Sequence, residues 1–249
     1  MDVQIIIPAR YASTRFPGKP LALLGDKTVI QRVYQQAKQV VDNVCVATDD
    51  KRIYDSVNAF GGVAIMTSTD HKSGTDRIAE AYRLLNSKAD IVINIQGDEP
   101  FIRPQQIQTL IDCFKSADTQ IATLVRQFKS DEDIFDPNIV KAIFSDATHK
   151  AIYFSRSPIP FLRGADKAQW SRLQPYYAHI GMYAYRAEVL QHIVHLPQST
   201  LEKAESLEQL RWLEAGVPIT IGITDSATIG IDTPADLEAA LKYLQKNNL

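Results

Sequence analysis

Three cations stand close together in one segment near the start of the chain, at Arg10, Arg15 and Lys19. A short apolar run typical of a strand precedes them, so we expect them on the loop that leaves this strand. Small residues between the cations allow close approach to the backbone, and positive charges on such a loop suit a polyphosphate. The GxxxxGK[ST] spacing of a Walker A loop does not occur in this segment. On charge alone, a solvated basic turn is the alternative interpretation.

Two carboxylates follow strand-like runs in distant parts of the chain. Asp98 comes after the apolar run ADIVINI, and Asp232 comes directly after TIGI. Ligands of open α/β sheets bind outside the carboxyl ends of the strands, and one or two carboxylates commonly bind Mg²⁺ together with phosphate oxygens. The two residues could therefore hold Mg²⁺ on a polyphosphate opposite the cationic loop. The alternatives are a helix N-cap for Asp232, which precedes Thr-Pro, and a turn residue for Asp98 in GDEP.

The polar motif DHKSGTDR, whose last residue is Arg77, leads from a loop into a segment with helical periodicity. In one interpretation Ser73 or Thr75 caps the helix and Asp76 favours its first turn. In the other, the backbone of the loop and the Arg77 side chain read the edge of a nucleobase. The composition of the loop does not separate the two.

Composition excludes several classes of protein. With 45% apolar and 22% charged residues, the 249-residue chain resembles a globular protein. The formal net charge of −2 argues against nucleic acid as the main partner, because binding to a phosphate backbone needs a basic surface. No run approaches the ~18 apolar residues of a membrane span, and the first apolar run is too short for a signal peptide. Cys45 and Cys113 lie in apolar runs, which indicates buried thiols in a reducing compartment. We therefore expect a cytoplasmic protein.

Short β-branched runs alternate with longer amphipathic ones, a pattern that predicts βαβ units around a largely parallel sheet. We expect strands at Val3–Pro8, Asn43–Thr48, Val63–Met66, Ala89–Ile95, Ile121–Val125, Val140–Phe144, Ala151–Phe154, His179–Tyr185, Ile219–Ile223 and Thr228–Asp232. Helices are expected at Thr28–Val41, Lys51–Phe60, Thr75–Leu85, Pro104–Lys115, Ala187–Val194, Leu201–Ala215 and Pro234–Lys246. The alternation breaks down between about residues 126 and 186. The chain thus reads as one α/β domain over residues 1–249, with a less regular insertion at roughly 126–186.

Seven motifs occur in order from one end of the chain to the other: PARYASTRFPGKP, DHKSGTDR, NIQGDEP, YFSRSPIP, HIGMYAYR, LEQLR and IGIDTPADL. Together they closely resemble the 3-deoxy-manno-octulosonate (Kdo) cytidylyltransferases, or CMP-Kdo synthetases. The resemblance spans essentially the whole chain. The related CMP-sialic acid synthetases carry a first loop richer in glycine and lysine, so RYASTRFPGKP resembles the Kdo branch.

This resemblance implies a three-layer, Rossmann-like nucleotidyltransferase fold, with a mostly parallel central sheet and an insertion that forms the dimer contact. It implies a cytoplasmic, Mg²⁺-dependent homodimer that transfers CMP from CTP to the anomeric hydroxyl of Kdo. The products would be pyrophosphate and CMP-Kdo, which serves lipopolysaccharide biosynthesis. Other acidic sugars, such as 8-amino-Kdo or a sialic acid, are alternative substrates. A catalytically silent nucleotide-binding homologue is the alternative from a different class.

The resemblance also assigns roles to residues whose motifs match. Residues that would bind CTP are Arg10, Ser13, Thr14, Arg15, Lys19, Ser73, Gly74 and Arg77. Asp98 and Asp232 would bind Mg²⁺, and with Arg10, Arg15 and Lys19 they form the expected catalytic set. Residues that would face the sugar acid are Gln96, Arg156, His179, Tyr183, Glu208 and Gln209. For these last residues a purely structural or solvated role is the alternative.

Direct displacement at the α-phosphorus suits this set of residues. Such a reaction depends on positioning and charge stabilisation, and it needs no nucleophilic Ser or Cys. We expect Arg10, Arg15 and Lys19 to offset charge on the α-phosphate and the leaving group. Either Arg156 or His179 is expected to pair with the Kdo carboxylate. The sequence offers no single obvious general base.

Overall fold

The computed structural model describes residues 1–129, 132–227 and 229–247. The chain forms two compact units, Met1–Gln108 with Thr228–Leu249, and Thr109–Ala227. The insertion expected at roughly 126–186 falls within the second unit, and residues 130–131 of it lie outside the described residues. The division into one domain with an insertion stays a prediction.

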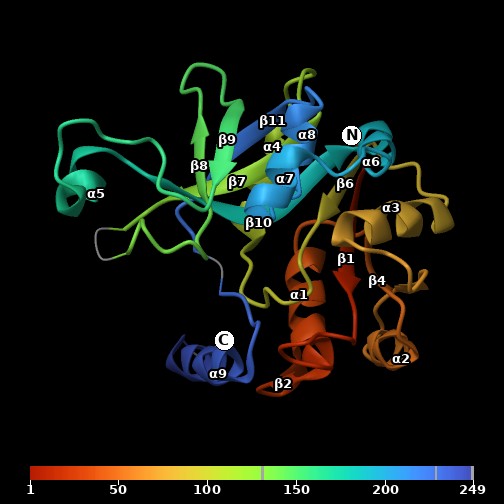
Figure 1. Cartoon of the computed structure of the whole chain (residues 1–249). Coiled ribbons are helices and arrows are strands. Elements are labelled where there is room, and N and C mark those ends of the chain that lie inside the picture. The colour runs from red at the N-terminus through yellow and green to blue at the C-terminus, as the bar shows by residue number, and fades with distance from the viewer. Residues whose placement is uncertain (130–131, 228, 248–249) are drawn as a thin grey trace. The chain divides into compact units, whose positions relative to one another are not determined.

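A parallel sheet with the strand order β6-β1-β4-β5 forms the centre of the first unit. Its strands β6, β1 and β4 are labelled in Figure 1. These strands are β1 (Val3–Ala9), β4 (Val44–Thr48), β5 (Ala64–Met66) and β6 (Ile91–Asn94). Ile5 of β1 lies in register with Val44 on one side and with Ile93 on the other. The apolar runs are buried, as expected for parallel strands covered by helices. The carboxyl ends of β1, β4 and β6 consequently share one edge.

Helices α1 (Val29–Lys38), α2 (Lys51–Ala59) and α3 (Gly74–Leu84) pack on this sheet. Each begins at a side chain that accepts a backbone N–H bond from the first turn, namely Thr28, Asp50 and Ser73. Such caps satisfy N–H groups that have no partner inside the helix. They also fix the loops that leave the strands, where the polar candidates of the sequence lie.

The C-terminal segment joins the first unit through α9 (Pro234–Asn247). Ile231 and Ala240 pack with Leu24 and Val29 in one buried cluster. Leu24 belongs to a short hairpin of β2 (Leu23–Leu24) and β3 (Lys27–Thr28), which follows the 3-10 turn η1 (Lys19–Leu21). The segment that carries Asp232 is therefore held against the beginning of the chain by apolar packing.

The second unit contains a mixed sheet. Its strands are β7 (Ile121–Gln127), β8 (Lys141–Phe144), β9 (Ala151–Ser155), β10 (Tyr177–Arg186) and β11 (Ile219–Ile223). β7 pairs with β11 in parallel and with β10 in antiparallel orientation, and β8 pairs antiparallel with both β10 and β9. Its helical elements are η2 (Lys167–Gln169), α5 (Trp170–Leu173), α6 (Ala187–Ile193), α7 (Thr200–Glu205) and α8 (Gln209–Glu214). α4 (Pro104–Cys113) carries the chain from the first unit into the second.

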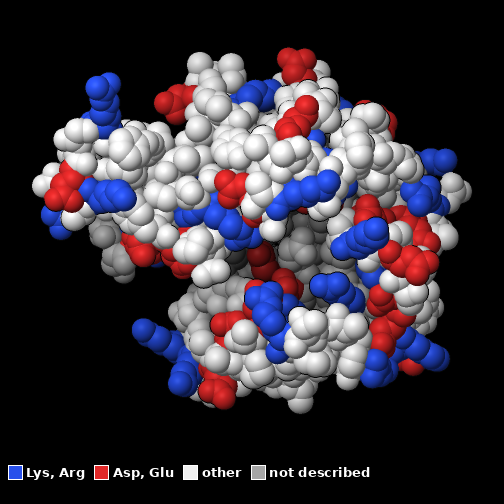
Figure 2. All heavy atoms as spheres, in the orientation of Figure 1, with Lys and Arg blue, Asp and Glu red and all other residues white. Residues whose placement is uncertain are grey.

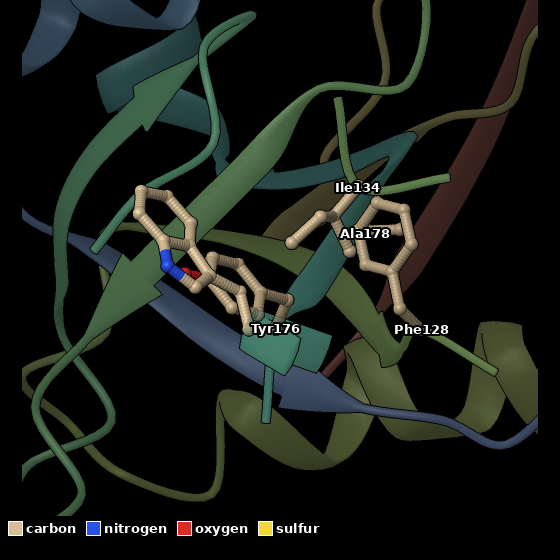
Figure 3. Close-up of a cluster of buried hydrophobic side chains, with 5 residues drawn as sticks. Phe128, Ile134, Tyr176 and Ala178 are labelled. Atoms are coloured by element: carbon tan, nitrogen blue, oxygen red, sulfur yellow. The ribbon is translucent and has the colours of Figure 1, made fainter. Parts of the chain in front are cut away.

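An aromatic cluster orders the irregular part of the second unit (Figure 3). Phe128, Ile134, Trp170, Tyr176 and Ala178 are buried together. The indole N–H of Trp170 donates to the carbonyl of residue 165 at 3.2 Å, and the Tyr176 hydroxyl donates to that of residue 160 at 2.6 Å. Buried aromatic side chains with satisfied polar groups thus hold a segment that has little regular secondary structure.

The predicted strands and helices are confirmed with shifts of a few residues at their ends, apart from two differences. The helix expected at Leu201–Ala215 is divided into α7 and α8, because Ser206 adopts a left-handed conformation with φ 53° that ends the first helix. The strand expected at Thr228–Asp232 is wrong for residues 229–232, which form no strand, and residue 228 lies outside the described residues. The apolar character of this run reflects a single anchor, the fully buried Ile231.

In the part of the chain that the structure describes, every helix is too short or too polar to cross a bilayer. On the face shown in Figure 2, lysine and arginine side chains are interspersed with aspartate and glutamate.

Candidate functional site

A pocket of about 260 Å³ lies at the carboxyl ends of β1 and β6 in the first unit. It is lined by Pro8, Ala9, Arg10, Ser13, Arg15, Lys19, Pro20, His71, Lys72, Ser73, Gly74, Arg77, Gln96, Gly97, Asp98 and Asp232. All of these residues belong to the same unit. The location agrees with the rule that ligands of open α/β sheets bind beyond the carboxyl ends of the strands.

Cations and carboxylates from three segments meet in this pocket. Lys19 Nζ lies 2.6 Å from Asp98 Oδ2 and 3.1 Å from Asp232 Oδ1. Arg15 Nη2 lies 3.0 Å from the same Asp232 oxygen. The Lys19 side chain is only 12% exposed, so its charge is held inside the pocket. The two carboxylates thus converge on one cation, although the sequence separates them widely.

Asp232 does not cap the following helix, which was the alternative interpretation of this residue. Thr233 Oγ1 accepts a bond from the backbone N–H of Asp236 at 3.2 Å, and Asp236 Oδ2 accepts from the backbone N–H of Thr233 at 2.8 Å. This reciprocal pair provides the capping box of α9. The side chain of Asp232 is consequently available to the cations of the pocket.

Close backbone packing places Asp98. The backbone N–H of Ile231 donates to the Asp98 carbonyl at 2.9 Å, which ties the two carboxylate-bearing segments together. A Cβ atom on Gly97 would lie 2.9 Å from the carbonyl oxygen of Pro8. Glycine is therefore required where the loop after β6 passes the end of β1. The sequence does not reveal this requirement by itself, although a glycine between a buried strand and an acidic residue is a signal for it.

Glu99 is a half-buried acid that sequence reasoning also missed. Its Oε2 is buried and has no hydrogen-bond partner among the described residues. Burial, followed by the negative charges of Asp98 and Asp232, raises the pKa of Glu99 to about 8. An acid that is mostly protonated at neutral pH thus lies next to Asp98 in the chain, behind the residues that line the pocket.

A second wall of the pocket is the start of α3. Ser73 and Asp76 form a capping box, so the Ser73 hydroxyl already accepts the backbone N–H of Asp76. Gly74 lies against the ring of Pro8, where a Cβ atom would be 3.3 Å from Pro8 Cγ. The two interpretations of this loop are therefore compatible, because the capping residue Ser73 also lines the pocket.

Arg77 is nearly completely buried and held by three groups. Its Nη2 donates to Asp49 Oδ2 at 2.7 Å, and its Nη1 donates to Thr67 Oγ1 at 2.6 Å and to the Ser68 carbonyl at 3.3 Å. Asp49 follows β4, so Arg77 links that strand end to the loop before α3. These three hydrogen bonds hold the Arg77 guanidinium in one orientation at the pocket wall.

Glu80 of α3 fixes the same loop from the other side. Its Oε2 accepts the backbone N–H of Ser68 at 2.8 Å and lies 2.5 Å from His71 Nε2. His71 lines the pocket beside Ser73. Glu80 therefore anchors the loop to α3 at two points, Ser68 and His71.

The structure brings together most of the candidates that belong to the first unit. Those that line the pocket are Arg10, Ser13, Arg15, Lys19, Ser73, Gly74, Arg77, Gln96, Asp98 and Asp232. Thr14 is not among the described residues that line it. The role of each residue toward a ligand stays a prediction.

The remaining candidates lie in the second unit. His179 and Tyr183 are on β10, where Thr123 Oγ1 lies 3.0 Å from His179 Nε2. Burial lowers the pKa of His179 to about 3, so its ring is neutral at physiological pH. A neutral imidazole can exchange a hydrogen bond with a carboxylate or hydroxyl, but it cannot supply a positive charge.

Arg156 and Gln209 differ in how far the protein already satisfies them. Arg156 Nε donates to the Glu205 carbonyl at 2.7 Å, and its Nη1 donates to that of Pro137 at 3.0 Å. Gln209, at the start of α8, is 5% exposed, and its Nε2 has no hydrogen-bond partner among the described residues. Glu208 precedes it and lines a separate polar hollow beside α7. A buried amide without a partner is a group that a ligand can satisfy.

Metal binding at the first pocket would rest on Asp98 and Asp232. In the part of the chain that is described, no cluster of three or more His, Cys, Asp or Glu residues forms a metal site. Two carboxylates that meet at one cation suit an ion that takes its other ligands from phosphates and water.

Comparisons with known proteins identify the family of this chain. A family model described as "Cytidylyltransferase" matches residues 4–221. The chain is 59% identical over 243 residues to a 3-deoxy-manno-octulosonate cytidylyltransferase of Parabacteroides distasonis, with 96% of each chain covered. It is 57% identical over 246 residues to the protein of that name in Bacteroides thetaiotaomicron, with 98% of each covered.

A solved structure is similar to this chain over its whole length. This structure, of CMP:2-keto-3-deoxy-manno-octonic acid synthetase complexed with CTP, matches with a TM-score of 0.91 and 45% identity. The match covers 99% of this chain and 100% of that one. The predicted α/β fold of the Rossmann-like nucleotidyltransferase class is confirmed.

Proposed function

We propose a reaction for this chain on the basis of its family. The chain belongs to the 3-deoxy-manno-octulosonate cytidylyltransferases, a group within the cytidylyltransferase family. The chain transfers CMP from CTP to the anomeric hydroxyl of Kdo. The anomeric oxygen forms a bond to the α-phosphorus, and the bond from that phosphorus to the departing pyrophosphate breaks. The observation that carries this proposal is the convergence of Arg15 and Lys19 with Asp98 and Asp232 in one pocket.

The cationic loop binds the triphosphate. Arg10, Ser13, Arg15 and Lys19 line the pocket and offer charged and neutral donors to phosphate oxygens. Arg15 and Lys19 offset charge that develops on the α-phosphate and on the leaving pyrophosphate. The backbone of this loop is fixed by its own hydrogen bonds, so only the side chains have to reorient toward the phosphates.

The start of α3 binds the cytidine. Ser73 and Gly74 present backbone groups to the pocket, and Arg77 presents an edge of its buried guanidinium. Asp49 and Glu80 hold this wall in place, which favours one orientation of the base. A preformed polar wall discriminates well, because a wrong base leaves its buried groups unpaired.

Asp98 and Asp232 hold Mg²⁺. Their oxygens already reach a common cation, Lys19 Nζ, so the donor set fits a divalent ion. When bound, Mg²⁺ neutralises triphosphate charge and lowers the pKa of the incoming hydroxyl. The carboxylates themselves orient the triphosphate relative to the cationic loop.

The residues proposed to face the sugar acid rest on the family resemblance. Gln96 lines the CTP pocket, while Arg156, His179, Tyr183, Glu208 and Gln209 belong to the second unit. The unpartnered Nε2 of Gln209 supports a role toward the sugar. Since His179 is neutral, Arg156 is the candidate for the carboxylate, and His179 is better suited to a sugar hydroxyl.

The assembly and the setting complete the proposal. We infer a cytoplasmic homodimer whose contact involves the irregular region at roughly 126–186. Its product serves lipopolysaccharide biosynthesis. Support for these points comes from the family alone.

A coupled assay of pyrophosphate release tests the reaction. Purified protein with CTP, Kdo and Mg²⁺ should release pyrophosphate, and Asp98→Asn should lose most of that rate. Competition with 8-amino-Kdo and a sialic acid identifies the preferred sugar. Folded protein that binds CTP but releases no pyrophosphate with any of these sugars would be a silent homologue, which contradicts the proposal.

A further inference from the structure

We propose that Tyr11 and Arg52 are positioning residues for the cationic loop, although neither is among the described residues that line the pocket. The inference rests on the proposed function, because it takes the ligand of this loop to be the triphosphate of CTP. Both residues would act through the backbone that carries Arg10 and Lys19, without touching the ligand.

Arg52 stacks on the ring of Tyr11. Its guanidinium carbon lies 3.3 Å from the ring centroid, which is a close cation–π contact. The same guanidinium donates to both carboxylate oxygens of Asp50, through Nε at 2.9 Å and through Nη2 at 2.6 Å. This two-pronged contact holds the planar group in one orientation.

Asp50 is itself fixed by the helix that it begins. It caps α2 by accepting the backbone N–H of Arg52 at 2.9 Å. Its own backbone N–H donates to Thr48 Oγ1 at 3.2 Å. The guanidinium over Tyr11 is therefore anchored to the end of β4 and the start of α2.

Gly18 touches the ring of Tyr11 as well. The backbone N–H of Gly18 donates to the Tyr11 carbonyl at 2.9 Å and closes the base of the loop. Gly18 adopts φ 72°, and a Cβ atom there would lie 3.0 Å from the Tyr11 ring atoms. The ring thus packs against both the Gly18 backbone and the Arg52 guanidinium.

This chain of contacts ends beside the two cations of the pocket. Arg10 directly precedes Tyr11, and Lys19 directly follows Gly18. The position of the Tyr11 ring thus sets where both residues leave the closed base of the loop. Loosening the ring would misplace phosphate-binding groups and leave Arg77 and the start of α3 untouched.

A direct role for Arg52 is the competing explanation. Its side chain is 59% exposed, so the guanidinium could meet a phosphate by itself. The two explanations differ in the role of Tyr11. Positioning needs the aromatic ring, whereas a direct contact needs only the arginine.

Calorimetric binding of CTP and of CMP, without Kdo, separates these possibilities. We would compare the wild type with Tyr11→Ala, Tyr11→Phe, Arg52→Ala and the double alanine variant, using Lys51→Ala as the matched control. Lys51 is the exposed neighbour of Arg52 and pairs with Asp55 on the surface of α2. Arg52→Ala removes a side chain that is 59% exposed, and thermal unfolding checks that every variant is folded.

Tyr11→Ala and Arg52→Ala should each weaken CTP binding about tenfold, and CMP binding less than about twofold, because CMP lacks the outer phosphates. Tyr11→Phe and Lys51→Ala should match the wild type. The double variant should be little worse than either single one, since both residues act through the same contact. Tyr11→Phe keeps the aromatic ring and should keep the CTP affinity that Tyr11→Ala loses, which shows that the ring itself is needed.

Two results would overturn the inference. One is an equal loss of CTP and CMP affinity, and the other is a loss in Arg52→Ala with none in Tyr11→Ala. Inorganic triphosphate serves as a second probe. If the folded wild type binds triphosphate but not CTP, and Tyr11→Ala weakens that binding, the proposed function fails while the positioning role stands. If the wild type binds neither compound, both fail.

Discussion

The ammonium of Lys19 donates to Oδ2 of Asp98 at 2.6 Å, so a carboxylate assigned to the metal already holds a cation of the protein. Asp232 shares the same ammonium at 3.1 Å. If the proposed metal site is correct, a divalent ion would compete with Lys19 for the same oxygens. A triphosphate would attract Lys19 and free the carboxylates, which would couple metal binding to nucleotide binding.

Replacing Lys19 tests this competition. Lys19→Met should bind Mn²⁺ more tightly than the wild type when no nucleotide is present, because the ammonium no longer occupies the carboxylates. The same variant should lose about a hundredfold or more in kcat/KM, since a charge that stabilises the leaving group is gone. Titration calorimetry with Mn²⁺ and the pyrophosphate assay measure the two effects. Lys51→Met is the control, and unchanged Mn²⁺ affinity in Lys19→Met would contradict the competition.

Asp232 and Thr233 are neighbours with different predicted effects. Asp232→Asn should reduce pyrophosphate release at least about a hundredfold, because a proposed ligand of the metal is lost. Its Tm should stay close to that of the wild type, since Asp232 does not cap α9. Thr233→Ala should instead cost about 1 kcal/mol of folding free energy, which corresponds to about 2–4 °C in Tm. A Tm loss in Asp232→Asn as large as that in Thr233→Ala would show that Asp232 has a structural role.

The buried pair of Asp49 and Arg77 should matter for both stability and binding. Asp49→Ala leaves the Arg77 guanidinium buried without its carboxylate, so we expect a loss of about 3 kcal/mol in the free energy of unfolding. Binding of CMP should weaken along with that of CTP, because Arg77 lies at the nucleoside wall. Urea unfolding and calorimetry report the two effects. Asp55→Ala, which breaks an exposed pair on α2, is the control and should cost less than about 1 kcal/mol.

Glu99 should make the fold less stable as pH rises. Its pKa is about 8 in the folded chain, against an ordinary value of 4.5, so between these values the folded state holds a proton that the unfolded state has released. By linkage, stability falls as pH rises through this window. Glu99→Gln should therefore raise the Tm at about pH 9 by several degrees and change it little at about pH 4. Thermal unfolding without nucleotide measures this, with Glu238→Gln on the exposed face of α9 as the control. An equal effect at both pH values would rule out titration as its cause.

Local sequence patterns predicted the helices and most strands well, because the helices begin at residues whose side chains can cap them. Asp50 and Ser73 cap helices that the sequence indicated. The rule about strand ends also brought Lys19 and Asp98 to one edge of a sheet. Ser206 was missed, because its left-handed conformation is set by the junction of two helices and serine carries no strong signal for it.

Features that depend on distant packing could not be predicted in this way. Thr233, and not Asp232, caps α9. Asp232 instead accepts a hydrogen bond from Lys19, a contact between distant residues that the local sequence does not indicate. The neutral state of His179 follows from burial that a strand pattern does not reveal. Gly97 is needed because Pro8, which belongs to another strand, passes within contact distance.

The closure of the first unit by its last segment has a consequence for synthesis on the ribosome. Lys19 and Asp232 are 213 positions apart, and at roughly 5–20 residues per second about 10–40 s separate their appearance. During this interval Leu24 and Val29 lack the covering side chains of Ile231 and Ala240. A nascent chain therefore carries its cationic loop long before it can assemble the carboxylate pair, and a stalled chain that ends before residue 231 never assembles it.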